Sequence, residues 1–143
     1  MNHLNSILLE GVLVKDPRVV AVADNGNRRL VKFDLANDRY YMDSSGAKKV
    51  ETLFIPVQVW GELANMCMEK MKSGMTCRAV GRLRMCNWVN KEGDKRSSIE
   101  ILASHLEYRR PWSAQDPHGG VEILEDKEKE ADKLGESVVL YEF

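Results

Sequence analysis

Apolar and polar residues alternate over most of the first 108 positions, and this pattern predicts a chain built mainly of β-strands. In residues 29–37, for example, Val31, Phe33 and Leu35 are expected to point inward, while Lys32 and Asp34 point outward. The same pattern predicts strands over residues 4–14, 18–23, 29–37, 51–60, 75–88 and 95–108, of which the second is short.

Short polar segments separate the expected strands. Asp16-Pro17 marks a turn, and Asp24-Asn25-Gly26-Asn27 is predicted to form a hairpin turn because Asn-Gly tolerates the positive φ angles that two-residue turns need. Residues 40–49 include Asp43-Ser-Ser-Gly46 and are interpreted as a mobile polar loop. Residues 90–94 are predicted to form a second hairpin loop.

One persuasive helix is predicted in the body of the chain, from Gly61 to Ser73. Its apolar residues recur at helical spacing, and Gly74 supplies a stop. These apolar residues are Leu63, Met66, Cys67 and Met71. Three main strands therefore precede the helix and two follow it. This order is that of the five-stranded OB barrel, whose strand face and loops bind oligonucleotides, so the expected fold class is all-β with one helix.

The composition of the 143 residues fits one domain of ordinary size with an appendage. No apolar run approaches the roughly 18 residues needed to span a membrane, and the N-terminus lacks the pattern of a signal peptide. Three cysteines, Cys67, Cys77 and Cys86, make an odd number with no Cys-x-x-Cys pair. We therefore expect a cytoplasmic protein without a disulfide framework, a metal site or a membrane partner.

The formal net charge of −1 hides an asymmetry along the chain. Residues 1–119 carry 18 basic and 14 acidic side chains, a net charge of +4, whereas residues 120–143 carry 3 and 8, a net charge of −5. Pro111, Pro117 and Gly119-Gly120 mark a linker between the two parts. We therefore expect an OB-fold domain over residues 1–110 and an acidic, disordered linker and C-terminal tail over residues 111–143. Within the tail, residues 122–134 are expected to stay solvated or to form a marginal helix.

The segment from Gly81 to Trp88 carries the most informative chemistry. In an extended strand one side carries Arg82, Arg84, Cys86 and Trp88, and the other side carries Leu83 and Met85. Two fixed charges suit phosphates, and a flat ring suits a stacked base, so this face is typical of a surface for unpaired nucleic acid. The alternative is that Trp88 is simply half-buried packing.

Five motifs, in order and spacing, resemble the bacterial single-stranded DNA-binding protein family over about residues 4–109. They are Asn5-Ser-Ile-Leu-Leu-Glu-Gly11 with Asp16-Pro17, Phe33-Asp-Leu-Ala36, Val59-Trp60-Gly61-Glu-Leu-Ala64, Gly81-Arg-Leu-Arg84 with Trp88, and Lys95-Arg96-x-x-x-Glu100. The resemblance implies an OB fold, usually a homotetramer, that coats exposed single-stranded DNA during replication, repair and recombination. It implies no cofactor.

The resemblance also implies which residues contact DNA. It places Tyr41, Phe54, Trp60 and Trp88 where the family stacks bases, and Arg84 at a phosphate-contacting position. Further cations in or beside the strands and loops are expected to add electrostatic attraction to phosphates: Arg82, Lys48, Lys49, Lys95 and Arg96. Two choices stay open, because Trp60 could equally be core, and Tyr40 rather than Tyr41 could be the binding ring.

Three features depart from the family pattern. Glu62 follows Trp60 closely, where a basic residue is common, and should weaken phosphate attraction there. Pro56 removes a ladder donor inside its strand, so a sheet edge or a bulge is expected. The chain also ends without the family's usual Ile-Pro-Phe peptide.

The family uses its acidic C-terminus to recruit replication and repair proteins, and the resemblance implies the same role for the end of this chain. The candidate partner-binding residues are Val138, Leu140, Tyr141, Glu142 and Phe143. The alternative is that residues 137–143 add a strand to the body, since branched and aromatic residues suit a sheet edge.

Other function classes are less well supported by the residues. His3, His105 and His118 are scattered without carboxylates or cysteines at ligand spacing, and no catalytic set stands out, so no enzyme is expected. A primosome or restart-type OB protein would carry fewer well-placed aromatics. An OB-type RNA-binding protein stays open, because stacking does not distinguish the two sugars.

Overall fold

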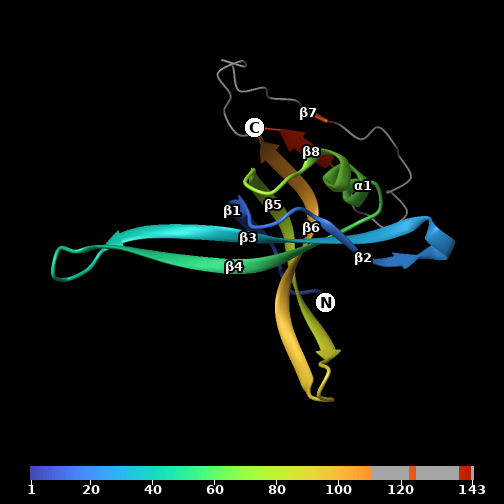
Figure 1. The fold of residues 1–143 in the computed structure, drawn as a ribbon, viewed down its shortest axis with the longest axis horizontal. Helices are drawn as coiled ribbons and strands as arrows, with labels where there is room; N and C mark the ends of the chain where they lie inside the picture. Colours follow the sequence, from blue (N-terminus) through green and yellow to red (C-terminus); the bar gives the residue numbers. More distant parts are fainter. Residues whose placement is uncertain (111–122, 125–138, 143) are drawn as a thin grey trace.

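The computed structural model describes residues 1–110, 123–124 and 139–142 (Figure 1). Its elements in chain order are β1 (Ile7–Leu13), β2 (Arg18–Ala23), the 3₁₀ turn η1 (Asp24–Gly26), β3 (Arg28–Met42), β4 (Lys48–Trp60), α1 (Gly61–Lys70), β5 (Thr76–Val89), β6 (Lys95–Arg109), β7 (Ile123–Leu124) and β8 (Val139–Glu142). The described residues contain no helix that is long and apolar enough to cross a membrane.

Five of the strands close into a barrel. β1 pairs antiparallel with both β3 and β5, β3 pairs with β4, and β5 pairs with β6. The parallel pairing of β4 with β6 at Val57 and Gln58 closes the ring. The helix α1 lies between β4 and β5 in the chain, so the predicted OB barrel with a helix after its third strand is confirmed.

The barrel core follows from the alternation along the strands. Val31, Phe33 and Leu35 of β3 are fully buried, which confirms the predicted inward face. The helix contributes Leu63, Ala64 and Cys67 to the same core. Burial raises the pKa of the Cys67 and Cys77 thiols, which keeps both sulfurs protonated and inert.

Two long hairpins project from the barrel as arms (Figure 1). The β3–β4 arm is longer than predicted, because β3 runs to Met42 and β4 begins at Lys48. The prediction of a mobile loop over residues 40–49 is therefore wrong for half of that segment, and the loop is residues 43–47. The Asp43 carboxylate stabilises this loop by accepting hydrogen bonds from the backbone N–H groups of Ser45 and Ala47, each at 2.9 Å.

The predicted end of the helix also needs correction. The helix ends at Lys70, not Ser73, because Met71 is extended and buried, and the Ser73 and Gly74 N–H groups bond to Asp16 and Leu13 near the end of β1. The β2–β3 connection is a hairpin turn over residues 24–27, as predicted, and Asp24, Asn25 and Gly26 all have positive φ. At Pro56 the β3–β4 ladder continues without a register shift, and pairing with β6 begins only at Val57. Pro56 therefore lies at a sheet edge, which is one of the two arrangements, edge or bulge, that the sequence predicted.

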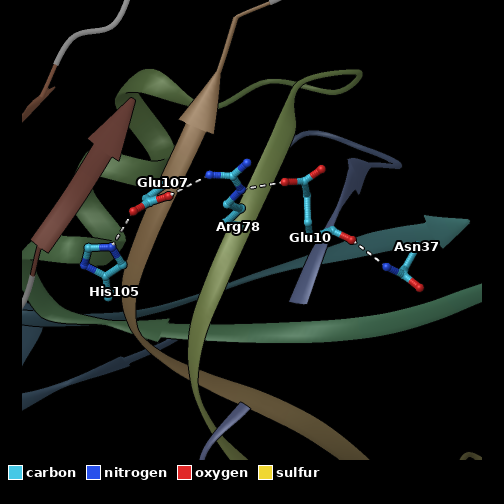
Figure 2. A network of polar contacts seen from close by, with 5 residues as sticks. All are labelled: Glu10, Asn37, Arg78, His105 and Glu107. Carbon is cyan, nitrogen blue, oxygen red and sulfur yellow. Dashed lines mark hydrogen bonds and ion pairs between the residues drawn. The ribbon is translucent and has the colours of Figure 1, made fainter. Parts of the chain in front are cut away.

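A polar network crosses the outer face of the β1–β5–β6 sheet (Figure 2). The Arg78 guanidinium bonds Glu10 at 2.5 Å on one side and Glu107 at 3.5 Å on the other. Glu107 also lies 3.2 Å from His105 Nε2, while Asn37 of β3 donates to the Glu10 carbonyl oxygen at 2.7 Å. The network therefore ties four barrel strands together at a partly exposed surface.

The C-terminal strand β8 joins the barrel sheet at its β6 edge. It pairs in parallel with His105–Tyr108 of β6, and β7 pairs antiparallel with β8. The strand-addition alternative is therefore observed for Val139–Glu142. Val138 and Phe143, two of the candidate partner-binding residues, lie outside the described residues, as does most of the acidic segment.

Deleting residues 120–143 is expected to lower the melting temperature by several degrees. The deletion removes the ladder between β8 and β6, and each kcal/mol lost from a domain of this size shifts the midpoint by roughly 2–8 °C. Thermal unfolding followed by circular dichroism checks this. An unchanged midpoint would mean that β8 adds nothing to the stability of the body.

Candidate nucleic-acid interface

The pairing register of the β3–β4 arm decides which of its side chains share a face. Directly paired residues lie on the same side of a ladder, and successive residues alternate. Trp60 pairs with Leu30, Gln58 with Lys32, and Phe54 with Ala36. Phe54 and Trp60 therefore lie on one face of the arm, together with Lys32.

The β5–β6 arm presents a second face of the same kind. Trp88 pairs with Arg96 and Arg84 pairs with Glu100, so Trp88, Arg84 and Arg96 point to one side. Arg82 also lies on this side, two residues before Arg84. The predicted common face of Arg82, Arg84 and Trp88 is confirmed. The reverse side is core only at Ile101, the ladder partner of Leu83; farther out Met85 and Ile99 are exposed.

A buried polar cluster joins the two faces into one surface. The carboxylate of Glu100 on β6 accepts hydrogen bonds from Lys32 Nζ of β3 at 2.8 Å and from Gln58 Nε2 of β4 at 3.1 Å. Gln58 Nε2 also lies 2.7 Å from Cys86 Sγ of β5, and Ser98 Oγ donates to Glu100 at 3.0 Å. The side chains of Gln58 and Glu100 are nearly fully buried by these contacts. Because residues of four strands meet there, the cluster links the two arms.

We name this continuous surface the binding face. Its rings are Phe54, Trp60 and Trp88, and the predicted cations on it are Arg82, Arg84, Arg96 and Lys48, the last of which pairs with Met42 on the Phe54 side. Phe54 is 65% exposed and Trp88 is 47% exposed, while Trp60 is half-buried. Core packing therefore does not account for Phe54 or Trp88. A hollow of about 450 Å³ beside Trp88 is lined by Trp88 and Arg96 of this face and by residues of the reverse side, namely Asn87, Val89, Lys95 and Ser97.

Two predicted residues lie on the other face of the β3–β4 arm. Tyr41 pairs with Lys49, and both are out of phase with Phe54. The Arg39 guanidinium lies over the Tyr41 ring, 5.1 Å from its centroid. Tyr40, by contrast, shares the Phe54 side and is 78% exposed. Lys95 pairs with Val89 on the reverse of the β5–β6 arm, yet it lines the hollow beside Trp88.

Sequence reasoning missed two cations at the binding face. Lys32 was expected only to point outward, and its bond to Glu100 could not be read from spacing. Arg28 lies over the Trp60 ring, with Cζ 5.3 Å from the centroid. The alternation of side chains along β3 could have identified both cations, because Arg28, Leu30 and Lys32 are spaced by two residues and therefore share a face.

Replacing Glu100 by glutamine is expected to cost about 1–2 kcal/mol of stability at neutral pH, since it weakens the contacts of a buried acceptor. Burial raises the pKa of Glu100, but hydrogen bonds from Lys32, Gln58 and Ser98 outweigh it and leave the pKa below its ordinary value. Because the pKa of Glu100 is lower in the folded than in the unfolded state, its charged form stabilises the fold above about pH 4.3. This stabilisation is lost as the pH falls through the folded-state pKa. The difference in unfolding free energy between parent and variant should therefore shrink below about pH 4.

Urea unfolding at several pH values measures this difference. Glu92→Gln is the matched control, since it removes an exposed carboxylate from the β5–β6 loop and should leave stability unchanged. A parent–variant difference that stays constant down to pH 3 would contradict a charged, stabilising Glu100.

Comparisons with known proteins agree with this surface and fold. A family model described as the single-strand binding protein family matches residues 4–108. Single-stranded DNA-binding protein 2 of Chlorobaculum tepidum is 26% identical over 100% of this chain and 96% of its own length. Single-stranded DNA-binding protein 1 of the same organism is 33% identical, covering 82% of this chain and 70% of its own.

A solved structure supports the fold alone. The Plasmodium falciparum SSB in complex with ssDNA matches with a TM-score of 0.64 at 19% identity, over 72% of this chain and 89% of that one. The family match spans the closed barrel and both arms that carry the binding face. This chain therefore belongs to the single-strand binding protein family.

Proposed function

We propose that this protein binds single-stranded DNA with little sequence preference and coats exposed strands. The observation that carries the proposal is the binding face, where Phe54, Trp60 and Trp88 lie outside the barrel core on one continuous surface with Arg84 and Arg96. The names of its relatives, single-stranded DNA-binding proteins, support the same conclusion.

Stacking and phosphate contacts explain why binding should tolerate any sequence. Every base has a π-face that can lie on an aromatic ring, and each stacked base contributes about 1–3 kcal/mol. Arginines on the same face attract phosphates without reading base edges. A surface of this kind holds a strand and performs no chemistry on it, so we propose a non-enzymatic role.

We propose that the coat acts in the cytoplasm during DNA replication, recombination and repair, as the family resemblance implies. We further propose a homotetramer. Leu8 and Val12 of β1 are exposed apolar side chains near the N-terminus and are suited to contacts between copies. Sedimentation equilibrium at micromolar concentration would show a persistent monomer if this is wrong.

We propose, finally, that the C-terminal tail recruits replication and repair proteins. Because Val139–Glu142 is paired with β6, a partner must either bind β8 in place or release it from the sheet. Capture of partners by the full chain but not by the chain lacking residues 120–143 tests this role.

Fluorescence anisotropy with labelled oligo-dT tests the main proposal. We expect saturable binding that weakens as salt rises, with little competition from a duplex of equal length. Equal competition by poly-U would favour the RNA-binding alternative. Failure to bind oligo-dT at low salt would exclude the proposed function.

A further inference from the structure

The charges of Lys32 and Glu62, near the Trp60 end of the binding face, do not by themselves favour the approach of a phosphate. Lys32 lies nearby in the ladder, but its charge is paired with the buried Glu100 carboxylate at 2.8 Å. The residue that follows Trp60 by two positions is the acidic Glu62, in the first turn of α1. A phosphate approaching the Trp60 ring therefore needs a cation from elsewhere in the chain.

Arg28 supplies that cation from the start of β3. It precedes Leu30, the ladder partner of Trp60, by two residues and so lies on the same face. Its guanidinium carbon is 5.3 Å from the Trp60 ring centroid, within the range of a cation–π contact. This contact holds the side chain in place before any strand arrives, which lowers the ordering cost of binding.

The charge of Arg28 remains available to a ligand. Its one ion pair in the described part of the chain is with Asp24 at 3.8 Å, between side chains that are 45% and 61% exposed. Such an exposed pair is weak and is screened by salt. A phosphate that meets the guanidinium at close range can replace it.

We propose that Arg28 binds a backbone phosphate of the single strand, at the nucleotide whose base stacks on the Trp60 side of the binding face. This inference rests on the proposed function and assigns it a residue outside the family motifs. The Arg28–Trp60 pair would then extend the strand's path from the two arms toward the β2–β3 hairpin, which carries Arg28 at its turn end (Figure 1).

The neighbouring arginine provides a matched control. Arg29 has the opposite parity along β3, and its guanidinium donates two hydrogen bonds to Asn65 Oδ1 of α1, at 2.9 and 2.6 Å. Arg28→Gln and Arg29→Gln therefore remove the same charge at adjacent positions but on opposite faces of the strand.

Oligo-dT binding is measured for the parent and both variants over a series of salt concentrations, with melting temperatures recorded to confirm folding. Each phosphate neutralised on a single strand contributes about −0.7 to the slope of log K against log salt. We expect Arg28→Gln to reduce the magnitude of the slope by about 0.7, with several-fold weaker binding at low salt. Arg29→Gln should keep the parent slope, and Arg28→Lys, which keeps the charge, should restore it.

The inference is overturned if Arg28→Gln keeps the salt slope of the parent protein. It is also overturned if Arg29→Gln reduces the slope by the same amount, or if Arg28→Lys does not restore it. These results leave the proposed function intact as long as the parent binds oligo-dT. If the parent protein does not bind oligo-dT, both the proposed function and this inference are wrong.

Discussion

Gly81→Ala is expected to destabilise the protein by about 3 kcal/mol, the largest stability loss among the substitutions considered. A Cβ at Gly81 would overlap the carbonyl oxygen of Leu102 on β6 and would lie 2.8 Å from its carbonyl carbon and 2.9 Å from the Ala103 Cα. All three are backbone atoms, so the strands must separate to accommodate a methyl group. Urea unfolding followed by fluorescence measures the loss.

Gly74→Ala is a comparison variant in which the cost comes from the backbone conformation alone and not from a steric clash, whereas Gly81 does not have a positive φ. Gly74 has a φ of +86° but open space around its ideal Cβ position, so the variant should lose only about 1 kcal/mol. Equal losses in the two variants would show that close approach of β5 and β6 at Gly81 is not what constrains this position. Gly81 lies where the β5–β6 register shifts.

Trp88→Ala is expected to weaken binding to oligo-dT by about 1–3 kcal/mol, because one stacked base is lost. The ring is exposed, so the folded state should lose little stability. Fluorescence anisotropy with a labelled oligonucleotide measures the change in affinity.

Met85→Ala is the control for Trp88→Ala. Met85 lies on the same strand and is 56% exposed, but it points to the reverse side of the arm. We expect parent affinity in this variant. If Met85→Ala and Trp88→Ala weaken binding equally, the strand does not lie on the face that carries Trp88.

The sequence was sufficient to predict the barrel because the inward residues of its strands form an unbroken alternation. Val31, Phe33 and Leu35 show this pattern, and all three are buried. The outer part of the β3–β4 arm could not be predicted in the same way. Tyr40, Met42 and Val50 are exposed, so no apolar face there distinguishes a strand from a loop.

The sequence predicted which types of residue form the site, but not which of them lie on one surface. Whether Tyr40 or Tyr41 shares a side with Phe54 depends on the β3–β4 register, and a shift of one residue would exchange them. Arg28 and Trp60 are 32 positions apart in the chain, so their contact follows from strand pairing and not from any motif. Sequence spacing reveals which residues share a strand, while the ladder decides which strands share a face.

Ultraviolet crosslinking of the full chain to bound oligo-dT, with the crosslinked residues identified by peptide mass spectrometry, tests most directly whether the strand lies on the binding face. The predicted result is crosslinks at Trp88 and at Phe54 or Trp60, with Tyr40 as a further site on the same side. Crosslinks confined to Tyr41 and other residues on the reverse sides of the arms would contradict the account.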